Sequence, residues 1–168
     1  SFHEPITFSG NLSTYQGFID LLNRVTGLKY SESQPQSTIY YGLVPVSNST
    51  STWFFGGIAG IGWIGDRAAV GLNIPGGAAQ VAAHEIGHNL GLRHSPCGSV
   101  DPSTVDPNYP YSDGTIGQYG VSMDRQNTTR TLVLPTAKDV MSYCSSRWIS
   151  DYTYQRLFDA QSQLLTAP

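Results

Sequence analysis

The chain has little charge, few sulfur-containing residues and no long apolar run. Charged residues make up 12% of its 168 residues, which is about half the usual share, and the formal net charge is −3. This balance offers no basic patch with which to neutralise phosphates, so we expect no nucleic-acid partner. The longest apolar stretch, from Trp53 to Ile64, is interrupted by glycines and is too short to cross a bilayer, so we expect no membrane partner either.

The length and the apolar content suit one domain of ordinary size. With 39% hydrophobic residues, such a chain can bury a sizeable core without disulfide staples. Surfaces poor in charge and rich in Gly, Ser, Thr, Tyr and Asn are common in secreted proteins, so we expect an extracellular protein. We also expect it to be a monomer. No signal segment or pro-segment is visible before Ser1, which favours a mature or excised form.

Three of the four histidines fall in one stretch, HEIGHNLGLRH. If this stretch is helical, His84 and His88 lie one turn apart on the same face and can hold one metal ion. Glu85 lies about 100° further round the helix and can bind a metal-activated water without being a ligand. Gly91 can end the helix in a left-handed conformation, after which the chain can turn back and bring His94 in as a third ligand. The stretch therefore predicts a zinc site.

The spacing H-E-x-x-H-x-x-G-x-x-H resembles the zinc signature of the metzincin clan of metallopeptidases. The alternative is an amphipathic core helix with unrelated histidines, which a spaced trio disfavours. The resemblance implies a methionine-containing turn beneath the metal, and Met141 in the run DVMSYC matches it. Without the upstream motif, Met141 would be interpreted as a packing residue.

The resemblance also implies roles for residues around and after this methionine. Tyr143 occupies the position at which astacins and serralysins carry a tyrosine that ligates zinc and stabilises the oxyanion, although it could equally be a buried hydrogen-bonded anchor. In metzincins the next segment forms a wall of the pocket that receives the substrate side chain after the scissile bond. Ser146, Arg147 and Trp148 are therefore candidate specificity residues, with simple packing as the alternative.

The two cysteines flank the candidate site. Cys97 lies three residues after His94, and Cys144 lies three residues after Met141. A bridge between them would close a loop of about 46 residues and contribute on the order of 4 kcal/mol. We favour this disulfide over two free thiols, or over Cys97 as a further ligand, because three histidines already leave zinc its one open position.

Periodicity and breaker residues predict the remaining elements. Ser13 with Gln16 forms a capping-box pattern for a first helix, which Gly27 would end. The active-site helix follows a Pro-Gly-Gly turn, and the segment 95–130 is expected to be irregular. Ser150 would cap the last helix. The predicted helices are 14–26, 78–90 and a C-terminal one, and the predicted extended segments are 38–46, 53–55 with 58–64, and 67–73.

These elements predict an α/β chain of α+β type. We expect a metzincin-like, twisted, mostly parallel sheet of four to five strands with a backing helix and an active-site helix, followed by an irregular subdomain that ends in a helix. The single catalytic domain, 1–168, would divide into 1–91 and 92–168. By the same resemblance, the segment 68–72 would be the sheet edge that pairs with substrate, through Ala69, Val70 and Gly71.

Two weaker patterns compete with this interpretation. The run from Gly60 to Gly65 satisfies G-x-G-x-x-G, but a dinucleotide site needs a helix directly after it, so strand glycines are favoured. Asp101, Asp106 and Asp113 could supply calcium oxygens, although solvated turn residues are favoured because no calcium-loop spacing is present.

Together, the residues and the resemblance predict a zinc-dependent endopeptidase that acts on extracellular proteins or peptides, with Glu85 as general base. One alternative is a non-catalytic zinc-containing binding module on a peptidase fold, although such modules tend to lose the glutamate or a ligand. The other is a zinc amidase that acts on non-protein substrates, because the chemistry is shared.

Overall fold

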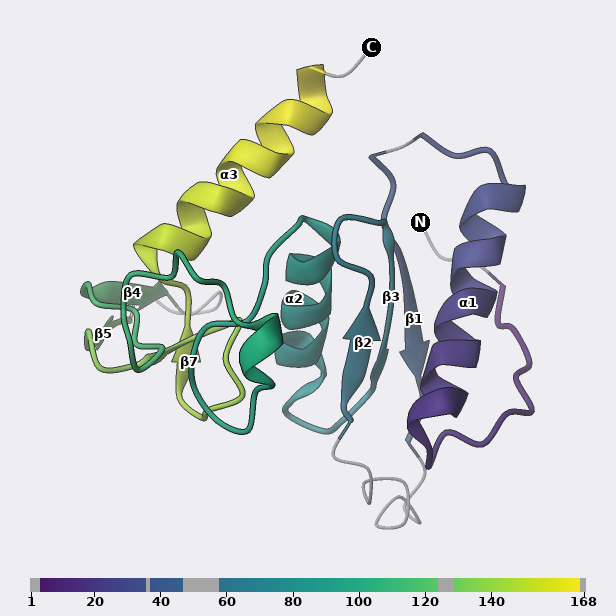
Figure 1. Cartoon of the computed structure of the whole chain (residues 1–168), viewed down its shortest axis with the longest axis horizontal. Coiled ribbons are helices and arrows are strands. Elements are labelled where there is room, and N and C mark those ends of the chain that lie inside the picture. Colours follow the sequence, from purple (N-terminus) through teal and green to yellow (C-terminus); the bar gives the residue numbers. More distant parts are fainter. Residues whose placement is uncertain (1–3, 36, 47–57, 124–128, 167–168) are drawn as a thin grey trace. The chain divides into compact units, whose positions relative to one another are not determined.

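The computed structural model describes residues 4–35, 37–46, 58–123 and 129–166. These fall into two compact units, Ser1–Asn89 and Leu90–Pro168, which are described separately. The first contains helices and strands in the order α1 (Tyr15–Ser31), β1 (Tyr40–Val44), β2 (Gly60–Gly62), β3 (Ala68–Leu72) and α2 (Ala78–Asn89) (Figure 1). The second contains the 3-10 helix η2 (Pro102–Thr104), β4 (Gly120–Met123), β5 (Arg130–Val133), β6 (Lys138–Asp139), β7 (Arg147–Trp148) and α3 (Asp151–Thr166).

The first unit is a small mixed sheet with a helix on either side (Figure 1). Its strand order is β1-β3-β2, with β1 parallel and β2 antiparallel to β3. Alternate residues of β3 point to opposite faces. Val70 packs in the core cluster that α1 covers, and a Cβ added at Gly71 would meet Val81 of α2. The α+β class is therefore confirmed, and the three extended segments within the described residues form strands as predicted.

Two details of the expected sheet are wrong. The described sheet has three strands rather than four to five, and only one of its two pairings is parallel. The run from Ile6 to Phe8 forms no strand, and the side chains of Ile6 and Phe8 pack against the core cluster. The predicted segment 53–55 lies outside the described residues.

The substrate-edge prediction for 68–72 is also wrong. Strand β3 lies at the centre of the sheet, where β1 pairs with one side of it and β2 with the other. Ala69, Val70 and Gly71 are all buried, and their main-chain ladders face these two neighbours. A substrate therefore has no free edge at these residues.

Helix α1 begins and ends later than its sequence pattern predicts. The capping side chain is Thr14 rather than Ser13, and its Oγ1 accepts a hydrogen bond from Gly17 N at 3.1 Å. The helix continues through Gly27, which is exposed and would have nothing within 4 Å of an added Cβ. A glycine inside a helix costs only about 1 kcal/mol relative to alanine. Burial of an apolar stripe outweighs that cost; its members are Phe18, Leu21, Leu22 and Val25.

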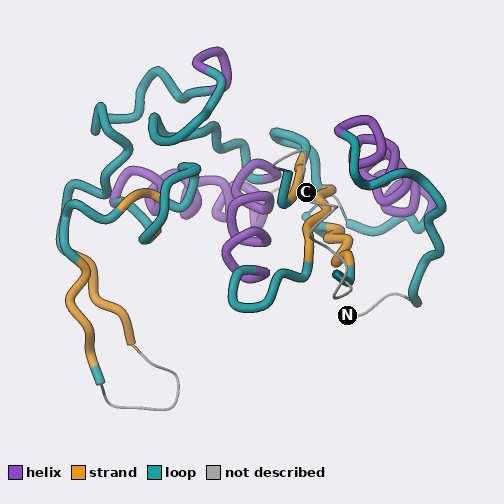
Figure 2. The backbone as a smooth tube through the Cα atoms, turned by 90° about the horizontal axis from the view of Figure 1, so that it is seen from below, coloured by secondary structure: helices purple, strands orange, loops and turns teal. Residues whose placement is uncertain are grey.

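The second unit has more regular structure than expected. Strands β4 and β5 form an antiparallel hairpin (Figure 2), so the prediction of an irregular 95–130 segment is wrong at β4. The strand forms because Val121 pairs with Leu132 and Ser122 with Thr131, partners that lie beyond the polar run that suggested a loop. The last helix begins as predicted, since Thr153 N donates to Ser150 Oγ at 3.0 Å. Among the described residues, no helix is long and apolar enough to cross a membrane.

Candidate metal centre

Helix α2 holds the first two histidines on one buried face. His84 and His88 are one helical turn apart, and their ring centroids lie 4.9 Å from each other. Only 4% and 6% of these two residues is exposed. The periodicity argument for this pair is therefore confirmed.

Hydrogen bonds join the C-terminal end of α2 to the segment between β2 and β3 and to the start of β3. Gly65 N donates to His88 O at 2.9 Å, and Arg67 Nη1 donates to Asn89 O at 2.9 Å, which satisfies two carbonyls that a helix end leaves unpaired. Asn89 is fully buried, and its Nδ2 donates to Trp63 O and Ala68 O. These bonds fix the helix turn that carries His88.

The chain leaves α2 through Gly91, whose φ of +88° is the left-handed conformation predicted for it. The main chain at His94 then lies beside residues 104–106. Its N–H donates to Thr104 O at 3.2 Å, its carbonyl accepts from Asp106 N at 2.8 Å, and its Nδ1 lies 2.9 Å from Thr104 Oγ1. Both the main chain and the ring of His94 are therefore held by this short segment.

One ring nitrogen from each of His84, His88 and His94 lies within 4.8 Å of the other two. Imidazole nitrogens suit zinc, and a set of three leaves one tetrahedral position open. The donor set therefore fits a zinc ion.

Glu85 lies on the sheet-facing side of α2 and is 6% exposed. Burial raises the pKa of its carboxyl group to about 8, because a buried carboxylate loses its hydration. A divalent cation bound nearby would oppose this shift by favouring the charged form.

Two glycines of β2 allow α2 to approach this strand closely. A Cβ added at Gly60 would lie 2.8 Å from both Cγ and Oε1 of Glu85, and one added at Gly62 would lie 2.7 Å from the Glu85 carbonyl oxygen. The chain continues from Gly65 into β3 rather than into a helix. Gly60 and Gly62 are thus strand glycines as predicted, whereas Gly65 has a φ of +78° and lies outside the strands. No sequence motif marked Gly60 as a neighbour of Glu85.

Met141 is 1% exposed within the second unit. Its carbonyl accepts a hydrogen bond from Ser95 N at 3.1 Å, and its N–H donates to Asp139 Oδ1 at 2.8 Å. Asp139 is fully buried, and its Oδ2 accepts from Ser150 N at 2.9 Å. This carboxylate therefore joins the turn at Met141 to the start of α3, a role that sequence patterns did not reveal.

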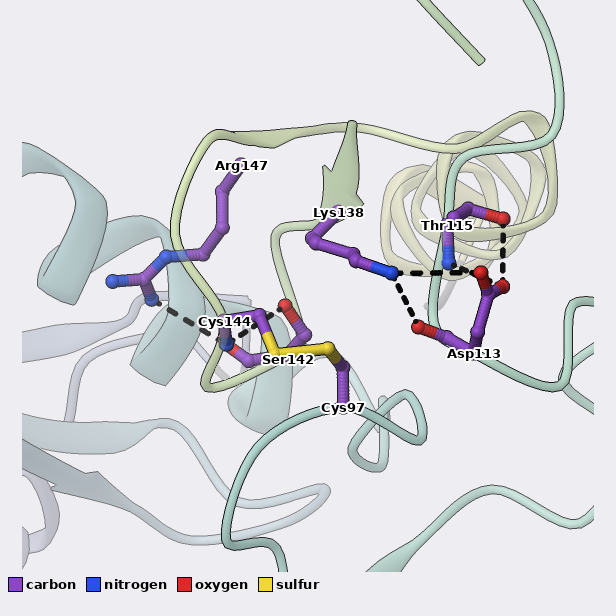
Figure 3. The surroundings of a disulfide bond; sticks show 7 residues. All are labelled: Cys97, Asp113, Thr115, Lys138, Ser142, Cys144 and Arg147. Atoms are coloured by element: carbon purple, nitrogen blue, oxygen red, sulfur yellow. Dashed lines mark hydrogen bonds and ion pairs between the residues drawn. A yellow bond between two sulfur atoms is a disulfide. The ribbon is translucent and has the colours of Figure 1, made fainter. Parts of the chain in front are cut away.

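A disulfide links Cys97 to Cys144, as predicted (Figure 3). The free-thiol and cysteine-ligand alternatives are therefore wrong. Beside the bridge, Tyr143 N donates to Cys97 O at 3.1 Å. Main chain and side chains together thus tie the segment after His94 to the segment after Met141.

Tyr143 lies next to the third histidine. Its ring centroid is 4.8 Å from that of His94, with the ring planes at 64°. The side chain is 53% exposed, so the alternative of a buried anchor is wrong. The Tyr143 side chain is therefore exposed beside the ring of His94.

The three candidate specificity residues sit at a pocket of about 580 Å³ in the second unit. Ser146 has a φ of +60°, and Arg147 and Trp148 form β7. Arg147 Nη1 lies 3.5 Å from Ser142 O. The other wall of the pocket comes from Ser122, 132–134, Thr136 and Ala137.

The three aspartates considered for calcium each have another role. Asp101 caps η2 by accepting from Ser103 N, and hydrogen bonds from the Ser103 N–H and hydroxyl lower the pKa of its carboxyl group. Asp106 accepts from Asn108 N and Tyr152 OH.

The third aspartate, Asp113, accepts a hydrogen bond from Thr115 and forms an ion pair with Lys138 (Figure 3). Within the described residues these carboxylates form no ion-binding group, so calcium is not supported.

Comparison with known protein families gives evidence that is independent of the histidine geometry. Comparisons with curated proteins and with solved structures gave no match. A family model described as metallo-peptidase family M12 matches residues 13–152, which include the three histidines, Glu85 and Met141. Because this match covers most of the chain and agrees with the histidine cluster, the chain belongs to the metallo-peptidase family M12 and is of metzincin type.

Proposed function

We propose that this domain is a secreted, zinc-dependent endopeptidase. The observation that carries the proposal is the group of three imidazole nitrogens on His84, His88 and His94, in a chain of the M12 family. The disulfide is compatible with an oxidising compartment outside the cell. Its substrates are proteins or peptides.

The histidines would hold zinc through one ring nitrogen each. When bound there, zinc supplies Lewis-acid chemistry by polarising a substrate carbonyl and acidifying a water molecule. Glu85 would take a proton from the attacking water and would later deliver it to the leaving amine. Tyr143 presents its phenol as a hydrogen-bond donor to the developing oxyanion.

Two features guide where the substrate lies. Strand β2 pairs with β3 on one side, and among the described strands none pairs with its other side. An extended peptide that adds to this free edge of β2 would pass beside Gly60 and hence near Glu85. We assign Ser146, Arg147 and Trp148 to the wall that receives a substrate side chain, on the basis of the pocket that they line.

The test of this proposal is hydrolysis of casein or gelatin by the zinc-loaded protein. We expect cleavage that a hydroxamate or o-phenanthroline abolishes and that added zinc restores after chelation. The same assay on N-acylated amines without a peptide bond distinguishes an amidase. Failure to cleave any polypeptide, with zinc bound, would overturn the peptidase proposal.

A Gly60→Ala substitution tests the close contact between β2 and Glu85. The new Cβ would lie 2.8 Å from Glu85 Oε1 and from Val81 Cγ1, so the carboxylate must move. A displacement of about 1 Å in a catalytic group can cost about 10²-fold in rate. We therefore expect kcat on a peptide substrate to fall by about this factor while zinc affinity stays unchanged.

Gly27→Ala is the matched control, because the Cβ added there meets nothing within 4 Å. It should leave kcat unchanged. Wild-type kcat in Gly60→Ala would show that the position of the Glu85 side chain does not depend on the space at Gly60.

A further inference from the structure

The ring of His94 has an ordered hydroxyl partner. Its Nδ1 lies 2.9 Å from Thr104 Oγ1, while its main-chain N–H donates to Thr104 O and its carbonyl accepts from Asp106 N. A neutral imidazole carries its proton on either Nδ1 or Nε2, and the partner of one nitrogen decides which nitrogen is left to bind a metal. The direction of this hydrogen bond therefore matters for the candidate centre.

The hydrogen bonds around Thr104 fix that direction. A threonine hydroxyl has a single proton to donate, and Thr104 Oγ1 donates it to Asp101 O at 2.8 Å. The lone pairs of Oγ1 are then left to face the ring, so the hydrogen bond requires a proton on His94 Nδ1. Nε2 consequently keeps its lone pair for a metal.

We propose that Thr104 is a positioning residue that sets the tautomer and the ring orientation of His94, and so raises the affinity of the centre for zinc. The inference rests on the proposed zinc site. Thr104 acts through His94 and is not itself a ligand. Partners of this kind in metal sites typically contribute about 10- to 100-fold in metal affinity.

The segment that carries Thr104 is held by its own hydrogen bonds and by one to α3. Asp101 Oδ1 accepts from Ser103 N at 2.9 Å and from Ser103 Oγ at 2.8 Å, and Asp101 O accepts from Thr104 N at 2.9 Å. Two residues further on, Asp106 accepts from Asn108 N and from the hydroxyl of Tyr152 on α3, each at 2.9 Å. These hydrogen bonds hold in place the hydroxyl that meets His94.

Three variants of the full chain test the inference. Thr104→Val keeps the branched shape and removes the hydroxyl, and Thr104→Ser restores the hydroxyl. Ser103→Ala, in the same 3-10 turn, removes a side-chain bond to Asp101 and leaves the bond to His94. Zinc affinity is measured by competition with a chromophoric chelator, and folding of each metal-free variant by circular dichroism.

We expect Thr104→Val to bind zinc about 10- to 100-fold more weakly than the wild type. Thr104→Ser and Ser103→Ala should stay within a few-fold of it. Equal affinities for Thr104→Val and the wild type would overturn the inference, and so would an equal loss in Ser103→Ala, which would point to the turn rather than to the hydroxyl.

A second measurement needs neither zinc nor a variant. Nitrogen-15 NMR of the metal-free wild type, with His94 neutral, should show the proton on Nδ1. A proton on Nε2 would overturn the role of Thr104 even if zinc binds. Failure of the wild type to bind zinc would instead overturn the proposed function, and the NMR result would still decide the tautomer.

Discussion

Replacing Glu85 with glutamine should lower kcat/KM for a peptide substrate by about 10²- to 10⁴-fold, the usual contribution of a general base. The amide has nearly the same shape as the carboxylate but does not accept the proton of the attacking water. Glu85 is not among the three residues that would ligate zinc, so the zinc content of the variant should remain at the wild-type level. Steady-state kinetics and metal analysis of the same preparation check both expectations.

Asp20→Asn on α1 is a suitable control for the Glu85 variant, because it removes one negative charge from an exposed residue whose carboxylate accepts a bond from Gln16 within the same helix. Its kinetics should match the wild type. Turnover within a few-fold of the wild type in Glu85→Gln would overturn the assignment of the base.

Loss of the disulfide should lower the free energy of unfolding by about 2–5 kcal/mol, as removal of native disulfides from small domains does. The change is the double variant Cys97→Ser with Cys144→Ser. The bridge spans 47 residues and joins the segment after His94 to the segment after Met141 (Figure 3). Urea unfolding of the metal-free protein gives the difference in free energy.

Ser145→Ala serves as the control for the double variant, because it changes an exposed serine next to Cys144 and leaves the bridge intact. Its unfolding midpoint should stay at the wild-type value. An unfolding free energy of the double variant within about 1 kcal/mol of the wild type would show that the bridge contributes little to stability.

The histidines could be predicted from the sequence because their geometry is local. Four residues make one helical turn, so the placement of His84 beside His88 depends only on α2 being a helix. The same is true of Gly91, which needs only a left-handed conformation after the last turn. The Cys97–Cys144 disulfide was also predictable, because two cysteines allow only one pairing within the chain.

The strand order could not be predicted in this way, because it depends on partners far along the chain. The resemblance placed an edge at β3, although the segment Ala68–Leu72 is apolar on both faces, a composition typical of a central strand. The hairpin of β4 and β5 was missed for a related reason: the polar run between the two strands hides their pairing.

Sequence analysis did not identify Thr104 and Asp139, because a sequence motif does not show which residues form hydrogen bonds with each other. Thr104 lies ten residues after His94, and Asp139 contacts main-chain groups of Met141 and Ser150. Both roles follow from distances between atoms. Gly60 is a similar case, because only the packing of α2 on β2 shows which side chain its missing Cβ makes room for.

X-ray absorption at the zinc edge of the loaded protein tests the central claim most directly. Three imidazoles on one ion predict one zinc per chain with three nitrogen ligands from histidine at about 2.0–2.1 Å and a light-atom fourth ligand. A spectrum with fewer than three imidazoles, with sulfur in the first coordination shell, or with an unchanged site in a His94→Ala variant would contradict the account.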